Sequence, residues 1–187
     1  FNNFRGLGQR ASLSFSTGTN YSVYQTTSKY RSISLSFTDP MVKDTPNLVG
    51  FSIFYTFRGA ATNYSFPLDF SMLGGSLSWG RRFRWPDDFF RGHWVLRGVQ
   101  KKYSSTNVLV SELGPYENLL GQASEGFNIT QVITRDSRDR PEFTTSGSRF
   151  SLETTLSGGP LGGNEDFHKH VLNLEWFTPT FWKFVLM

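Results

Sequence analysis

The sequence contains no cysteine and no long apolar run. Without cysteine among its 187 residues, the chain has no disulfide framework, no thiolate metal site and no thiol nucleophile. No run of 18 or more apolar residues occurs, which excludes a transmembrane helix. The chain also starts without methionine and without a signal peptide. We therefore expect a processed or incomplete N-terminus.

The chain carries a small excess of positive charge, which is spread along the sequence, and it is rich in aromatic residues. The net charge is +4, and the basic residues form only short clusters, at 81–84 and 101–102. A nucleic-acid-binding surface gathers such residues into a patch or stripe, so no nucleic-acid partner is expected. Aromatic residues make up 17% of a chain whose mean hydropathy is −0.35. This combination is typical of a membrane barrel with a wet interior and aromatic girdles.

Small polar and large apolar residues alternate strictly in several stretches, such as 11–16, 32–37 and 49–57. Successive side chains of a strand point to opposite faces, so each stretch has one apolar face and one face of Ser, Thr and Gly. A transmembrane barrel turns the apolar face to lipid. The pattern predicts an all-β chain with strands at 9–17, 30–38, 48–58, 70–83, 91–103, 126–135, 148–157 and 168–177, and the start of another at 181–187.

The connections between these strands alternate in character. One set is polar and rich in Gly, Ser and Asn, at 18–22, 59–63, 104–126 and 157–164. The other set carries prolines and aromatic rings, at 38–41, 84–90, 139–143 and 177–182. Every second connection of an antiparallel sheet lies at the same end, so the aromatic set predicts a belt at one membrane interface. Because the longest loops are expected outside the cell, this rim should be periplasmic, with Trp85, Phe89, Phe90, Trp176, Phe177, Phe181 and Trp182 as its anchors.

Three passages resemble the barrel of the BamA-type outer-membrane protein assembly factors, the bacterial surface antigen superfamily. Residues 3–9, followed by an alternating strand, resemble its first barrel strand. Residues 34–40 resemble its second strand and Asp-Pro turn, and residues 134–141 with 145–149 resemble the turn after its sixth strand. The resemblance implies an antiparallel transmembrane β-barrel in the bacterial outer membrane. That barrel has sixteen strands, so we expect 1–187 to be a partial barrel domain of about eight to nine strands, without POTRA domains.

The resemblance further implies that the protein folds and inserts other outer-membrane β-barrel proteins, with no enzyme activity and no cofactor. The implied partners are nascent barrel proteins, outer-membrane lipids and accessory lipoproteins. A first strand that opens laterally would present a free edge, which is a template for another strand. We expect Gly6 and Gly8 to act as its hinge and the client strand to pair with Gln9, Arg10, Ala11, Ser12, Leu13, Ser14, Phe15 and Ser16.

Other protein classes remain open. A passive pore or a protein-secreting transporter barrel would share the alternation, but its first strand would stay paired. A soluble carbohydrate-binding β-sandwich would use exposed aromatic rings and need no detergent. A closed eight-stranded barrel also fits the chain length.

The polar clusters are interpreted structurally. His168 and His170 lie two residues apart near Asp166, but we interpret them as wall residues and expect no metal site. The charged run at 136–140 predicts a salt-bridged turn in preference to a catalytic site. No Gly-x-Ser-x-Gly elbow of a serine hydrolase occurs.

Overall fold

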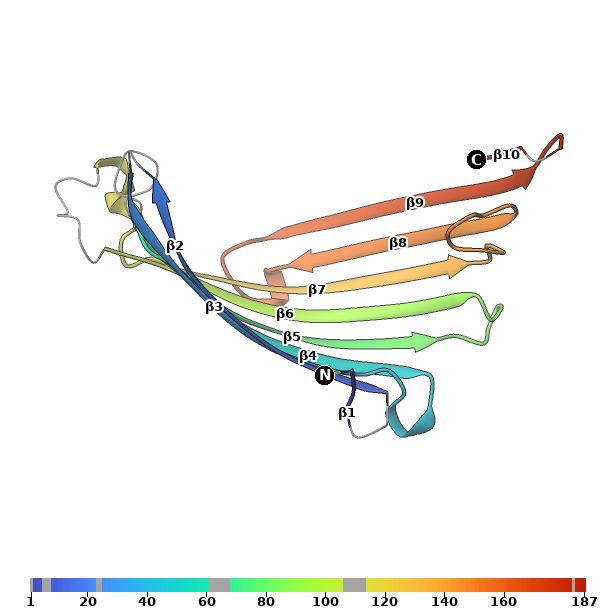
Figure 1. The fold of residues 1–187 in the computed structure, drawn as a ribbon, viewed down its shortest axis with the longest axis horizontal. Helices are drawn as coiled ribbons and strands as arrows, with labels where there is room; N and C mark the ends of the chain where they lie inside the picture. Colours follow the sequence, from blue (N-terminus) through green and yellow to red (C-terminus); the bar gives the residue numbers. More distant parts are fainter. Residues whose placement is uncertain (1, 5–7, 23–24, 61–67, 106–113, 183) are drawn as a thin grey trace.

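The computed structural model describes residues 2–4, 8–22, 25–60, 68–105, 114–182 and 184–187. They form one antiparallel sheet in which the strands lie side by side in chain order (Figure 1). The long strands are β2 (Gln9–Ser22), β3 (Gln25–Asp39), β4 (Asn47–Arg58), β5 (Asp69–Arg82), β6 (Phe90–Ser104), β7 (Ala123–Asp136), β8 (Gly147–Ser157) and β9 (Phe167–Pro179). Short strands β1 (Asn2–Phe4) and β10 (Val185–Leu186) flank them, and single 3-10 turns occur at η1 (Val42–Asp44), η3 (Gly114–Leu119) and η4 (Gly159–Leu161).

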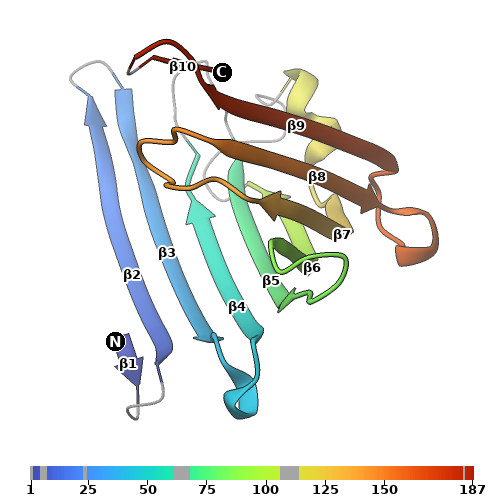
Figure 2. The same cartoon turned by 90° about the vertical axis from the view of Figure 1, so that its right-hand side faces the viewer.

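The sheet curves strongly into a trough, with β2 and β9 toward its two margins (Figures 1 and 2). Within the described residues the two margins do not pair with each other, so the sheet is open. Consecutive antiparallel order and strong curvature are the properties of a β-barrel wall. The predicted fold class, an all-β antiparallel partial barrel, is confirmed.

The two faces of the sheet differ in chemistry and exposure. The polar face carries Ser12, Ser36 and Ser52. The apolar face carries their sequence neighbours, such as Leu35 beside Ser36 and Ile53 beside Ser52. Along β4 the side chains of Val49, Phe51, Ile53 and Tyr55 are exposed, whereas those of Ser52, Phe54 and Thr56 between them are partly covered. Only one apolar side chain in the described part of the chain is fully buried, that of Leu68. The apolar face therefore suits lipid, whereas a soluble sandwich would have buried it.

The predicted strands match the observed ones, with two corrections. The polar loop expected at 18–22 is wrong, because β2 continues to Ser22 and Asn20 still pairs with Ser28 of β3. Gly, Asn and Ser favour turns, but cross-strand pairing overrides this local preference. Strand β1 was not predicted. The four aromatic connections lie at one end of the sheet, which we call the aromatic end (Figure 1).

The described helical segments are short turns, and none of them is long and apolar enough to cross a membrane.

Candidate functional site

Strand β2 has a long neighbour on one side only. It pairs with β3 from Arg10 opposite Thr38 to Ser22 opposite Gln25. On its other side, β1 covers only the first two residues, since Asn2 pairs with Arg10 and Phe4 with Gln9. From Ser12 onward, the described strands give β2 no second partner. Most of the predicted pairing segment, Gln9 to Ser16, therefore lies along an edge.

The backbone of β2 points alternately toward β3 and toward the open edge. The Gly59 amide donates to the Lys29 carbonyl over 2.7 Å, and the two residues lie opposite each other on the extension of the β3–β4 register. Hydrogen-bonded pairs alternate along an antiparallel ladder, so odd-numbered residues of β3 bond β4 and even-numbered ones bond β2. By the same alternation, Ser14 bonds β3, whereas Leu13 and Phe15 direct their N–H and C=O groups to the open edge.

The side chains of β2 keep the two faces distinct up to the edge. On the polar face, the hydroxyls of Ser12 and Ser36 lie 2.7 Å apart and those of Ser14 and Ser34 lie 2.6 Å apart. On the apolar face, Leu13 is 71% exposed, compared with 44% for Leu35 on the next strand. The missing neighbour accounts for this difference. A strand added at the edge would cover Leu13 and continue the ladder.

The start of β2 is fixed by local contacts. The Gln9 side-chain amide donates to Asp39 Oδ2 over 2.8 Å, which ties the strand to the end of β3. Gly8 has a φ of +72°, and its N–H donates to Asn3 Oδ1 over 2.7 Å. This left-handed conformation, which glycine adopts without strain, helps the chain to reverse so that β1 lies on β2. Gly8 thus belongs to the β1–β2 turn, and Gly6 lies outside the described residues.

The expected rim residues lie at the aromatic end, but not all on one face. Trp85, Phe181 and Trp182 are each more than 80% exposed, in the connections after β5 and β9. Trp176 is 74% exposed on the apolar face. Phe177 follows it in β9, so its ring lies on the polar face instead.

Phe89 and Phe90 surround a cation that the sequence analysis did not single out. The Arg135 guanidinium lies 5.6 Å from the Phe89 ring centre and 6.0 Å from that of Phe90. Its Nε also pairs with Asp87 Oδ2 at 2.8 Å. The ion pair and the rings join the β5–β6 connection to β7. These residues are far apart in the sequence, so only the strand pairing reveals the contact.

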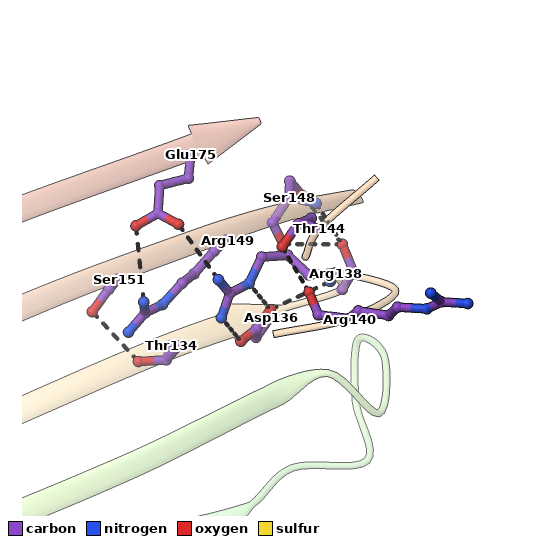
Figure 3. Close-up of polar contacts among 10 residues, drawn as sticks. Thr134, Asp136, Arg138, Arg140, Thr144, Ser148, Arg149, Ser151 and Glu175 are labelled. Carbon is purple, nitrogen blue, oxygen red and sulfur yellow. Dashed lines mark hydrogen bonds and ion pairs between the residues drawn. The ribbon is translucent and has the colours of Figure 1, made fainter. Parts of the chain in front are cut away.

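A second charged cluster lies where β7 ends, on the polar face (Figure 3). Arg138 donates from Nε and Nη2 to the two carboxylate oxygens of Asp136, each over 2.9 Å. Glu175 on β9 lies 3.8 Å from Arg138 and 3.8 Å from Arg149 on β8. The network therefore joins three consecutive strands at the rim. It is the salt-bridged turn that the charge pattern indicates.

The β7–β8 connection is organised by Asp139. Its carboxylate accepts hydrogen bonds from the Thr145 amide and hydroxyl and from the Ser146 amide. These bonds favour the charged form and hold the pKa of Asp139 well below its ordinary value of 3.8. A carboxyl whose pKa is lowered on folding stabilises the loop above its unfolded pKa, and this contribution is lost as the pH falls through the folded pKa.

We therefore expect Asp139→Asn to speed hydrogen exchange of the Thr145 and Ser146 amides at neutral pH. In the unsubstituted protein, the protection of these amides relative to their intrinsic exchange rate should fall progressively as the pH is lowered below 3.8. Glu142→Gln changes the same loop at an exposed position and is the control. Equal exchange rates in the two variants at pH 7 would show that Asp139 does not hold the loop.

The predicted wall histidines lie on the apolar side of β9. The His170 ring nitrogen Nδ1 lies 3.0 Å from the Thr154 hydroxyl of β8. Across the described ranges, no group of three or more His, Asp or Glu side chains is placed to hold a metal ion.

One known protein family matches almost the whole chain. The model of the Omp85 superfamily domain matches residues 3–187. A segment of 55 residues is 40% identical to the outer membrane protein assembly factor BamA of Nitratidesulfovibrio vulgaris. This segment is 27% of the present chain and 7% of that relative. The chain thus matches only a small part of that relative's length. The family match and this identity confirm the resemblance that the motifs indicated.

Proposed function

Because this chain belongs to the Omp85 superfamily, we propose that it is part of an outer-membrane barrel that folds and inserts other β-barrel proteins. In this proposal β2 is the template strand, and a client strand pairs along residues 9–16. The family match and the similarity of one segment to a BamA protein carry the proposal. The position of β2 at a margin of the described sheet is compatible with it.

The membrane makes such pairing favourable for many client sequences. A backbone N–H or C=O group in lipid has no water to bond, and each unsatisfied group costs several kcal/mol. The edge groups of Leu13 and Phe15 and those of an incoming strand satisfy each other without regard to side chains. Sequence-tolerant recognition of this kind is strand addition to a sheet edge.

Strand β1 would have to leave or shift for the client strand to reach Gln9 and Arg10. Among the described residues, β1 pairs with β2 at these two positions. The proposed hinge at Gly6 and Gly8 would permit this movement, since glycine takes up large φ and ψ changes. The pairing with β3 would remain and keep β2 in the wall.

The rim would act on the bilayer and on partner proteins. Exposed Trp and Phe side chains favour the membrane–water interface, and Trp85, Trp176, Phe181 and Trp182 would anchor the aromatic end there. A locally thinned or mismatched bilayer lowers the cost of inserting a strand.

Nascent outer-membrane barrel proteins and accessory lipoproteins are the proposed partners. The proposed activity involves no cofactor and no chemical turnover.

A second candidate function is protein secretion through the barrel lumen. Pairs of small hydroxyl groups line the polar face, as at Ser52–Ser76 and Thr130–Thr155. A lumen lined by small polar groups would pass an extended chain without binding it tightly. In this case the edge of β2 would stay paired with the last strand of the same barrel.

Disulfide crosslinking separates the two functions, since the chain has no native cysteine. Single cysteines replace Ser12 or Ser14 in the full-length protein and are paired with cysteines along the terminal strand of a stalled client barrel. If the protein folds client barrels, register-specific crosslinks to the client strand should form at both Ser12 and Ser14. Ser151, on the polar face of β8, is the mid-wall control and should give none. Crosslinks to the protein's own last strand alone would favour the secretion function.

A further inference from the structure

A hollow lies on the apolar side of the aromatic end, between the turn before β4 and the end of β5. Its volume is about 700 Å³, and its lining includes Pro46, Arg81, Phe83, Arg84 and Trp85. Nothing in the proposed client pairing uses this hollow, because it lies at β4 and β5, two to three strands away from β2.

The face on which the hollow opens follows from the strand alternation. Trp79, Arg81 and Phe83 occupy every second position, so they share the apolar face. Trp79 stacks on Trp94 of β6 with ring centres 4.6 Å apart, and Phe83 meets Trp94 edge to face at 6.2 Å. Arg81 thus lies at the level of an aromatic girdle, where a membrane has its headgroups.

Three cations line the hollow, Arg81, Arg82 and Arg84. None of them has a carboxylate partner among the ion pairs of the described residues, and Arg82 donates from Nε to the Asp88 carbonyl oxygen over 2.8 Å. The nearby Asp87 is already paired with Arg135. Arg81 and Arg84 are thus exposed cations at the hollow without a carboxylate partner among the described residues, which favours binding of an anion.

We propose that this hollow binds the phosphodiester headgroup of an anionic phospholipid in the leaflet at the aromatic end. The ligand must offer negative charge to Arg81 and Arg84 and, on the side of the Trp79–Trp94 stack, an apolar tail. An acidic peptide lacks the tail, and a free phosphate lacks any group for the apolar wall. The proposal rests on the proposed membrane placement of the wall and is independent of client folding.

The test measures lipid retention by the full-length protein in detergent, using native mass spectrometry and phosphatidylglycerol as the probe. Removing both charges, in Arg81→Gln/Arg84→Gln, should weaken binding roughly 30-fold, from the contribution of a basic residue near an anionic membrane surface. Arg81→Lys/Arg84→Lys keeps the charges and should retain most of the affinity. Heat-modifiable migration in gels verifies that each variant is folded.

The matched control removes two other exposed cations, in Arg140→Gln/Lys169→Gln, and should bind like the unsubstituted protein. Arg140 lies in the β7–β8 loop and Lys169 on the polar face of β9. Millimolar inorganic phosphate should not displace the lipid. Equal loss in the control, unchanged binding in the Gln variant, loss in the Lys variant or displacement by phosphate would each overturn the proposal.

Discussion

The variant Leu13→Pro in the full-length protein is expected to abolish assembly of client barrels and to leave the protein's own sheet intact. The N–H of Leu13 points to the open edge of β2, not to β3, by the alternation of the ladder. Proline removes this donor and places a ring where the client strand would pair. An edge strand tolerates proline when its missing N–H faces away from the sheet.

The neighbouring variant Ser14→Pro is the control, because the N–H of Ser14 bonds β3. It should destabilise the wall itself, through a lost ladder bond and a steric clash. Client folding is measured by the heat-modifiable gel migration of client barrels in cells that depend on the variant. The folding of the variant itself is measured by its own heat-modifiable migration. Normal client folding with Leu13→Pro would rule out β2 as the template. Equal damage from both prolines would contradict the assigned direction of the backbone groups.

The variant Gly147→Ala is expected to lower the free energy of unfolding by about 3 kcal/mol or more. Gly147 begins β8 with a φ of +107°, a conformation that side chains rarely adopt. An added Cβ would also meet the Ser137 carbonyl oxygen and the Arg138 Cα, which belong to the backbone and cannot rotate away. The turn that holds the Arg138 network would have to move.

The variant Gly121→Ala separates the cost of the backbone strain from the cost of the steric clash. Gly121 has a φ of +72°, and its added Cβ would have no neighbour within 4 Å. This variant carries the backbone strain without the clash and should cost about 1 kcal/mol. Urea unfolding of the purified protein in detergent, followed by tryptophan fluorescence, measures both. If the two variants cost the same, the contact with Ser137 and Arg138 is not rigid.

The alternation of residue types was sufficient to predict the wall. A period of two assigns each residue to a face without knowledge of its partners, so the stretch at 49–57 predicted β4 and its lipid-compatible side. The order of strands also followed, because short connections leave consecutive antiparallel pairing as the simplest arrangement. The aromatic connections then had to meet at one end. The role of residues 9–16 as a template strand rests on the family resemblance and stays a prediction, since nothing local in the sequence distinguishes an edge strand from a wall strand.

Tertiary structure alone decided the contacts between strands. The Arg135 pair with Asp87 and the approach of Glu175 to Arg138 join residues about 40 positions apart or more. The continuation of β2 to Ser22 and the return of β1 onto Gln9 depend on pairing partners, which override local turn preferences. The hollow beside Arg81 likewise exists only once two turns lie together. Periodicity in the sequence determines which way a side chain points, and the register between strands determines what it meets.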